Sequence, residues 1–401
     1  MYVLIGIIGI SVFLFIAYLL SVDKKKIPYK TVLIGLIIQF FTAVFMLKTY
    51  IGVKIFDSVN KGFLILLNYS NHGAKFLFGS LVDSQKTGAQ VAFQVLPLII
   101  FVSAFMGILV YFGIIQFIVK IFAKLFYKTL KITGVEAFTS SLLIFMGIES
   151  LTGVKEYIKE MNDSRLFTIM TTFMSTIAGS VMAAYVSFGA KAGHLLTASL
   201  MSAPAAIIIS KIMIPDVDST KEDSLDNVKI KQKENNIIEA IANGTTDGVN
   251  LAIQVGAMLI AFISLIYLLN DFIGLSGLTL EKLLSYLFSP IALLIGIKPS
   301  EAMEAGKLLG IKTVFNEFIA YMQLKTLIIN KTLSQRSITI ITYALCGFAN
   351  FGSIGILIGG VSGIAPNKKA AVAKLAFKSL VAGLLATLMT ASMVSILLPY
   401  R

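Results

Sequence analysis

The chain is short of charge, cysteine and tryptophan. Only 14% of its 401 residues are charged, against about 25% in a soluble domain, while 57% are hydrophobic and the mean hydropathy is +0.87. This balance excludes an ordinary soluble domain and predicts a protein that crosses the bilayer several times. A single cysteine, Cys346, excludes an internal disulfide framework. Without tryptophan, tyrosine and phenylalanine must form any interfacial aromatic belt.

Catalytic motifs are also missing. The sequence has no metal-binding histidine spacing, no nucleophile elbow and no glycine loop for phosphates, so we expect no enzyme and no cofactor. The net charge of +13 could suggest a nucleic-acid partner. Its basic residues instead stand at the ends of apolar runs, as membrane topology requires, so no nucleic acid is expected. An intramembrane enzyme that uses Glu149 and Glu317 as a carboxylate pair stays the alternative from another class.

Apolar runs of about 20 residues can each cross the bilayer, and the basic residues near 24–26, 120–131 and 368–369 belong on the cytoplasmic side. Residues 52–80 and 275–297 are too polar or too amphipathic to span, so they are predicted to be surface helices. Residues 215–236 form a polar loop. The eight predicted spans are residues 2–20, 31–47, 91–117, 166–188, 192–214, 249–269, 337–362 and 371–398.

Two further stretches, residues 137–161 and 299–330, have limbs too short to span. Each carries a carboxylate near its middle, Glu149 or Glu317, and precedes a span interrupted by small and polar residues. Ionisable groups at membrane depth mark substrate or ion paths. We therefore predict two re-entrant helical hairpins that enter from opposite faces, as in the inverted repeats of secondary transporters. The fold class is an all-α polytopic membrane protein with eight transmembrane helices and an inverted repeat.

The same pattern divides the chain. Residues 1–90 are expected to form N-terminal helices and a surface helix that serve as scaffold. Residues 91–214 form the first repeat with hairpin 137–161. After the loop at 215–236, residues 237–401 form the second repeat with hairpin 299–330.

The hairpin tips and helix breaks supply carboxylates, amides and hydroxyls, which suit a neutral polyhydroxylated solute. Broken helices also free carbonyls and helix ends for a small cation, and a poorly solvated carboxylate can bind a proton. Cation-coupled transport of a small polar solute follows, with a passive channel as a further alternative. Glu317 could instead pair with Lys312 as a buried structural ion pair, and Glu149 could be an interfacial loop residue. Asn350 and Ser353 could serve only helix packing. The residues concerned are Glu149, Glu317, Asn316, Asn350, Ser353, Thr176 and Ser175.

Two segments resemble the concentrative nucleoside transporter family. Residues 310–321, GIKTVFNEFIAY, are close to its G-x-K-x-x-x-N-E-F-V-A-Y signature, and residues 346–355, CGFANFGSIG, are similar to its C-G-F-A-N-x-[SG]-S-I stretch. Weaker matches at 75–79, 95–101 and 255–262 extend the resemblance over the whole chain. It implies a homotrimer in the cell (inner) membrane that imports nucleosides against their gradient with a cation, H⁺ or Na⁺.

The resemblance also implies residue roles. Glu317, Asn350 and Ser353 would bind the ribose. Glu149 and Val181 would face the base, and Phe348 would line the pocket. In sodium-coupled members a cation lies between the first hairpin and the broken helix, where the ligands would be the Thr176 hydroxyl and the carbonyls of Met146 and Ile177.

The chain departs from the family pattern at two places. The family's G-Q-[ST]-E at the first tip is here Gly147-Ile148-Glu149, one residue shorter and without the polar pair that reads the base. Where sodium-coupled members carry an asparagine near this hairpin, the chain has Leu142-Leu143, which removes a side-chain ligand. Purine or pyrimidine preference, and H⁺ or Na⁺ as coupling ion, therefore stay open.

Overall fold

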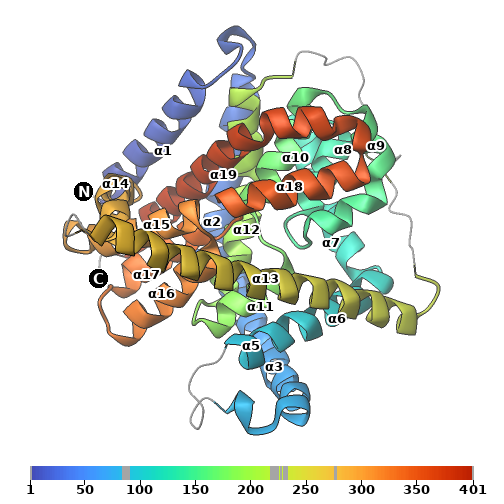
Figure 1. Cartoon of the computed structure of the whole chain (residues 1–401). Helices are drawn as coiled ribbons and strands as arrows, with labels where there is room; N and C mark the ends of the chain where they lie inside the picture. The colour runs from blue at the N-terminus through green and yellow to red at the C-terminus, as the bar shows by residue number, and fades with distance from the viewer. Residues whose placement is uncertain are drawn as a thin grey trace.

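The computed structural model describes residues 2–83, 91–216, 225, 228, 234–274 and 278–399. All regular secondary structure within these ranges is helical, and Figure 1 shows the helices gathered around a central group that includes α12 and α19. The predicted all-α class is thereby confirmed. The predicted loop at 215–236 lies largely outside the described residues.

Among the described residues, six helical segments are long and apolar enough to cross a membrane, and two shorter apolar helices, Val3–Leu19 and Phe351–Ile364, accompany them. Together they correspond to the eight predicted spans. In chain order they are α1 (Tyr2–Leu19), α2 (Tyr29–Lys48), α5 with α6 (Val91–Gln94, Leu96–Tyr111), α10 with α11 (Asp163–Ser175, Gly179–Ser187), α12 (Ala192–Met213), α13 (Ile237–Gly274), α17 with α18 (Gln335–Leu345, Phe351–Ile364) and α19 (Lys369–Leu397).

Burial separates central from peripheral spans. In the most apolar window of α10–α11 and of α12, 94% of residues are buried, and for the segment containing α19 the share is 78%. In α2, α5–α6 and α13 it is between 22% and 28%. A span that is apolar yet exposed faces lipid, so the second group forms the periphery. Hydroxyl-bearing residues such as Thr168, Thr172 and Ser210 can therefore lie in the centre, where they hydrogen-bond to helix carbonyls and to each other.

The span predicted over 91–117 is two elements. Helix α6 ends at Tyr111, and Gly113, with φ +73°, turns the chain into α7 (Ile114–Leu130). A positive φ is readily adopted by glycine, so a reversal of direction fits inside an apolar run. Pro97 stands at the start of α6, just after the short helix α5.

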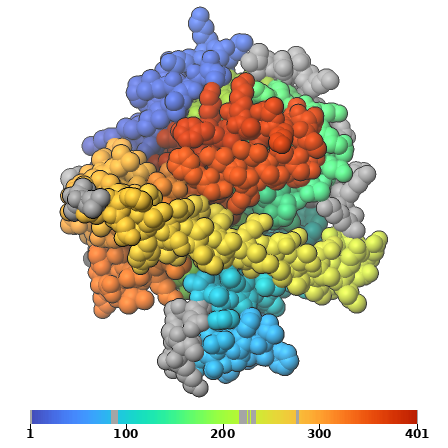
Figure 2. Space-filling view, in the orientation of Figure 1, coloured from blue at the N-terminus to red at the C-terminus, as the bar shows by residue number. Residues whose placement is uncertain are grey.

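Helix α13 is longer than the span predicted over 249–269. Its 38 residues extend about 57 Å, roughly twice the hydrocarbon thickness, so it is longer than an upright crossing requires. Figures 1 and 2 show it crossing the whole front of the molecule as a yellow ridge. It packs closely on α6 because a Cβ at Gly244 or Gly248 would lie only 2.7 Å from the α6 backbone. This is the close approach that small residues permit between membrane helices.

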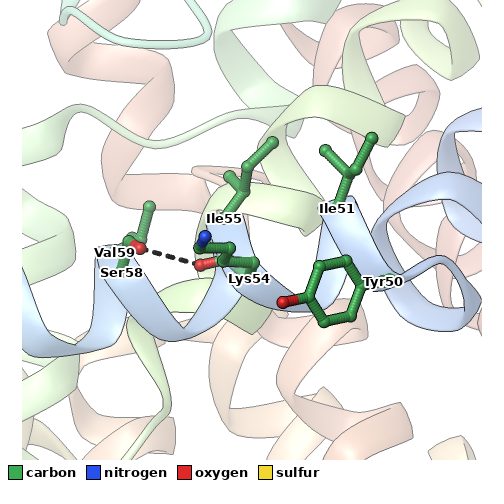
Figure 3. A pocket seen from close by; sticks show the side chains of 6 residues that line it. All are labelled: Tyr50, Ile51, Lys54, Ile55, Ser58 and Val59. Atoms are coloured by element: carbon green, nitrogen blue, oxygen red, sulfur yellow. Dashed lines mark hydrogen bonds between the residues drawn. The ribbon is translucent and has the colours of Figure 1, made fainter.

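The two predicted surface helices are α3 (Tyr50–Phe78) and α14 (Leu280–Leu294). Helix α3 contacts α2, α12 and α6 but leaves most of its length exposed. Figure 3 shows a groove along its first turns, lined by Tyr50, Ile51, Lys54, Ile55, Ser58 and Val59. The Ser58 hydroxyl there donates to the Lys54 carbonyl of the same helix (2.8 Å), so its proton is used within α3. Helix α14 packs along α15 (Ala302–Val314).

Both hairpins are present. The first consists of α8 (Gly134–Leu142), a turn, the 3₁₀ segment η3 (Ile148–Val154) and α9 (Lys155–Glu160). The second consists of α15, the residues Phe315-Asn316 and α16 (Glu317–Ile329). No single limb reaches the roughly 20 residues needed for a span.

A glutamate anchors the base of each hairpin. Glu136 accepts from the ammonium of Lys211 on α12 (2.6 Å), and both side chains are buried. Glu301 accepts from the main-chain N–H and hydroxyl of Ser334, the residue that caps α17 (both 3.0 Å). The pairing of Glu136 with Lys211 offsets the cost of burying both charges, and each hairpin is thereby joined to a span.

Candidate substrate and ion site

The two broken helices touch at their breaks. The chain is extended at Thr176 between α10 and α11, and residues 346–350 separate α17 from α18. Gly347, with φ +147°, lies against the other break, since a Cβ there would be 2.9 Å from the carbonyl of Ser175. Only glycine combines this φ with so close an approach. The first hairpin joins the contact, because the Gly179 N–H donates to the Phe145 carbonyl (3.0 Å).

Glu317 is held by α11 and by the segment just before α18. It is the first residue of α16 and is 2% exposed. Its Oε1 accepts from the Tyr185 hydroxyl of α11 (2.7 Å), and its Oε2 accepts from Nδ2 of Asn350 (2.6 Å). A carboxylate at this depth needs such donors to offset its lost hydration.

Two helix N-termini also converge on this carboxylate. Asn350 caps α18, since its Oδ1 accepts from the Ser353 N–H (2.8 Å), and Asn316 caps α16 in the same way through the Ile319 N–H (2.9 Å). Asparagine is a preferred N-cap, and the N-terminal end of a helix favours negative charge. The asparagines of the two motifs thus bring two helix N-termini, which favour negative charge, to the Glu317 carboxylate.

Lys312 contacts the α17 side of the break between α17 and α18. It is fully buried, and its ammonium donates to the Ala344 carbonyl (2.7 Å) and the Thr387 hydroxyl (3.1 Å). Its hydrogen bonds go to these groups rather than to Glu317, so the ion pair considered as an alternative is not the arrangement found. Ala344 lies in the last turn of α17, where a cation is favourable. The Lys312 ammonium therefore lies at the C-terminal end of α17, and the Glu317 carboxylate lies at the N-terminal end of α18.

Sequence reasoning missed Tyr185. Its ring stacks on Tyr321 (centroids 4.4 Å apart) and meets Phe318 edge-on (5.0 Å), and the Tyr321 hydroxyl is fixed by the Thr342 carbonyl (2.8 Å). A signal was available, since Tyr185 lies one helical turn after Val181 on the same face. A buried tyrosine also needs a partner for its hydroxyl.

The other residues predicted for the substrate site lie on or beside the same elements. Val181 is buried on α11, one turn before Tyr185. Phe348 lies in the break before α18 and packs on Phe173 of α10 (centroids 5.3 Å apart). Ser353 takes part through its main-chain N–H. Val181 is thus on the helix that carries Tyr185, and Phe348 and Ser353 are within three residues of Asn350.

Glu149 lies apart from Glu317. It is exposed, and its carboxyl group folds back over Gly147. It lines a groove of about 450 Å³ against the far end of α18, formed with Ile148, Thr152, Lys155, Lys159, Gly360, Gly363, Ile364 and Pro366. Glu317 contacts Asn350 at the near end of α18, about 15 Å of helix away from Gly360. In this structure the two carboxylates therefore do not form one cluster.

The residues of the implied cation site gather where the first hairpin meets the first break. The Thr176 hydroxyl donates to the Thr172 carbonyl (2.8 Å), the Ile177 N–H donates to the Ser199 hydroxyl (3.4 Å), and the Met146 N–H donates to the Leu142 carbonyl (3.0 Å). The Thr176 hydroxyl uses its proton in this bond, so its oxygen keeps lone pairs. Leu142 and Leu143, both buried, add no side-chain oxygen.

Comparison with known families covers nearly the whole chain. The model described as Na⁺ dependent nucleoside transporter N-terminus matches residues 8–81, the one described as Nucleoside recognition matches residues 92–192, and the one described as Na⁺ dependent nucleoside transporter C-terminus matches residues 194–395.

Among curated proteins, the uncharacterized transporter YutK of Bacillus subtilis is 38% identical over 98% of both chains. The nucleoside permease NupC of Helicobacter pylori is 34% identical, over 97% of this chain and 96% of its own. Mouse solute carrier family 28 member 3 is 36% identical over 97% of this chain and 58% of its own.

Solved structures agree. CNTnw in an inward-facing substrate-bound state superposes with a TM-score of 0.92 at 36% identity, covering 99% of this chain and 98% of the other. A doubly substituted CNTnw in an outward-facing state gives 0.94 at 37% identity, with the same coverage. These relatives are transporters and not enzymes, so the intramembrane-enzyme alternative is rejected. The chain belongs to the concentrative nucleoside transporter family.

Proposed function

We propose that the protein is a secondary active symporter that imports nucleosides with a cation by alternating access. The observation that carries the proposal is the Glu317 carboxylate, held by Tyr185 from the first repeat and Asn350 from the second. A group bound by both repeats senses their relative position. Neighbouring structures of CNTnw in inward-facing and outward-facing states support the alternation.

The ribose hydroxyls are the ligands we propose for this carboxylate. A carboxylate has about four lone-pair sites, and two are used by Tyr185 and Asn350, so further sites are available to a sugar diol. Asn350 and Ser353 complete the ribose site, with Phe348 beside it. Val181 and Glu149 face the base, and Glu149 reaches it in another state of the transport cycle.

Uptake into proteoliposomes tests this function. Labelled uridine or inosine should accumulate above its outside concentration while a cation gradient lasts. Glu317→Gln should reduce uptake at least about tenfold, because charged hydrogen bonds are worth about 1.5–3 kcal/mol each. The matched control is Glu160→Gln at an exposed position of α9, which should transport normally. Normal uptake by the Glu317 variant would remove this residue from the site, and equilibration without accumulation would indicate a passive channel.

The coupling cation is H⁺ or Na⁺, and an ion-substitution assay decides between them. For Na⁺, the proposed ligands are the Thr176 hydroxyl and the carbonyls of Met146 and Ile177. Uptake should then stop in sodium-free buffer, and Thr176→Val should raise the sodium concentration for half-maximal uptake about tenfold, since one ligand is lost. For H⁺, uptake should persist without sodium and stop with a protonophore, and Thr176→Val should have no effect on ion dependence.

The assembly is a homotrimer in the cell (inner) membrane. The family resemblance supports this assembly. The mass of the protein released from lipid nanodiscs measures the copy number directly.

Competition with unlabelled purine nucleosides, pyrimidine nucleosides and other small polar solutes defines the substrate class.

A further inference from the structure

Helix α7 carries a lysine stripe that the transport site does not use. Lys120, Lys124 and Lys128 follow one another at four-residue spacing and lie on one helix face, and Lys131 continues the line at the C-terminal end. All four are exposed. The sequence of α7 contains no aspartate or glutamate. These four residues are called the lysine stripe below.

An apolar stripe runs beside it. Phe117, Ile121 and Leu125 are exposed by 68%, 54% and 41%. The opposite face is buried against the rest of the protein by Ile115, Val119, Ala123, Phe126 and Leu130, which fixes the rotation of the helix. A helix that presents lysines and large apolar side chains side by side lies at the boundary between lipid headgroups and hydrocarbon.

The start of α2 adds to the same basic surface. The Thr31 hydroxyl donates to the Leu130 carbonyl (3.1 Å), so the exposed Lys30 lies near the end of α7. The nearest carboxylates along the chain have other partners, because Asp23 pairs with Lys26 (3.6 Å) and Glu136 with Lys211 (2.6 Å). Neither neutralises the lysine stripe.

The second repeat provides an internal comparison. Helix α14 precedes the second hairpin as α7 precedes the first, and it also packs on the hairpin that follows. It carries one acid, Glu281, and one base, Lys282. Since α14 fills the equivalent place without a lysine stripe, packing before a hairpin does not require one.

We propose that the lysine stripe of α7 binds anionic phospholipid headgroups of the surrounding bilayer. Phosphate oxygens accept charge-assisted hydrogen bonds from ammonium groups, and each lysine near an anionic leaflet adds measurable attraction. The apolar stripe lies among the acyl chains while the lysines hold the phosphates above them.

The test is retention of lipid by the full-length protein. Protein is exchanged into nanodiscs of phosphatidylcholine with a minor share of labelled phosphatidylglycerol, and the enrichment of the label around the protein is measured. The wild type should enrich phosphatidylglycerol. Lys120→Gln with Lys124→Gln and Lys128→Gln should lower its affinity at least about tenfold, and raised salt should weaken wild-type enrichment. The three corresponding Lys→Arg substitutions should retain it.

Two comparisons keep the proposal open to refutation. Lys54, Lys61 and Lys75 are exposed on α3, and replacing them with Gln removes the same charge from another helix. This α3 variant should keep the enrichment of phosphatidylglycerol. Equal enrichment by the wild type and the α7 Gln variant, or equal loss in the α3 variant, overturns the proposal. If the triple variant does not fold, the Lys124→Gln variant and the salt dependence of the wild type separate the same two outcomes. Free inorganic phosphate that displaces the label as well as lipid does would assign the site to phosphate instead.

Discussion

At the scale of single residues, the site depends on which groups hold the Glu317 carboxylate. Glu317 was recognisable as an ionisable residue at membrane depth, and Asn350 from the polar interruption of its span and the motif that resembles the family. The contact of Tyr185 with Glu317 was not recognisable, because it joins residues 132 apart in sequence. Exposure of Glu149 was also out of reach, since it depends on how the shortened tip folds into a 3₁₀ segment.

Tyr185→Phe tests the tyrosine directly. The ring stack with Tyr321 remains, so the protein should fold, but Oε1 of Glu317 loses a donor. An unsatisfied buried group costs about 1–3 kcal/mol, so the KM for nucleoside should change by about tenfold. The measurement is initial uptake rate against nucleoside concentration.

The control for that variant is Tyr321→Phe, which removes a hydrogen bond to the Thr342 carbonyl and leaves Glu317 untouched. Its KM should stay within about twofold of the wild type, since the lost bond involves neither Glu317 nor Asn350. Matching KM values for the two variants would mean that the Tyr185 hydroxyl does not hold the carboxylate for substrate.

At the scale of elements, the existence of each apolar span was predicted more accurately than the residues at which its helices begin and end. Both hairpins were found from their short limbs and carboxylates. The end of α6 was missed because the run stays apolar through Gly113, and the backbone conformation there is not visible in composition. The length of α13 was missed because its polar first turns look like a loop, although Gly244 and Gly248 pack on α6. Division of the chain into scaffold and two repeats stays a prediction.

The contact between α6 and α13 makes a prediction about stability. In Gly248→Ala the new Cβ would lie 2.7 Å from the backbone of Ile100, which cannot move aside easily, so the two helices must separate. Overpacking of this kind costs about 1–3 kcal/mol. Gly256→Ala, on the same helix, meets only the flexible end of Leu96 at 3.3 Å and is the matched control. Thermal unfolding in detergent should show a lower Tm for the first variant only, and equal Tm values would mean that the close contact is not needed.

At the scale of the whole molecule, transport requires the site to move relative to something fixed. Helices α6 and α13 are joined through glycines over several turns, so we expect them to stay together as one unit. The second hairpin meets this unit where Phe315 lies against Phe262 of α13 (centroids 5.9 Å apart). If the hairpin slides past α13 during transport, a covalent link at this contact must stop transport.

Phe262→Cys with Phe315→Cys supplies the two thiols for such a link. The native Cys346 is fully buried, so a short cleavable thiol cross-linker should react at the introduced pair. Nucleoside uptake should fall to background after cross-linking and return after reduction, because the link restrains motion without removing any group that binds substrate. Each single variant, treated in the same way, should keep its uptake. Full uptake by the cross-linked protein would mean that α13 travels with the hairpin, and the moving boundary would then have to be sought on the other side of α13.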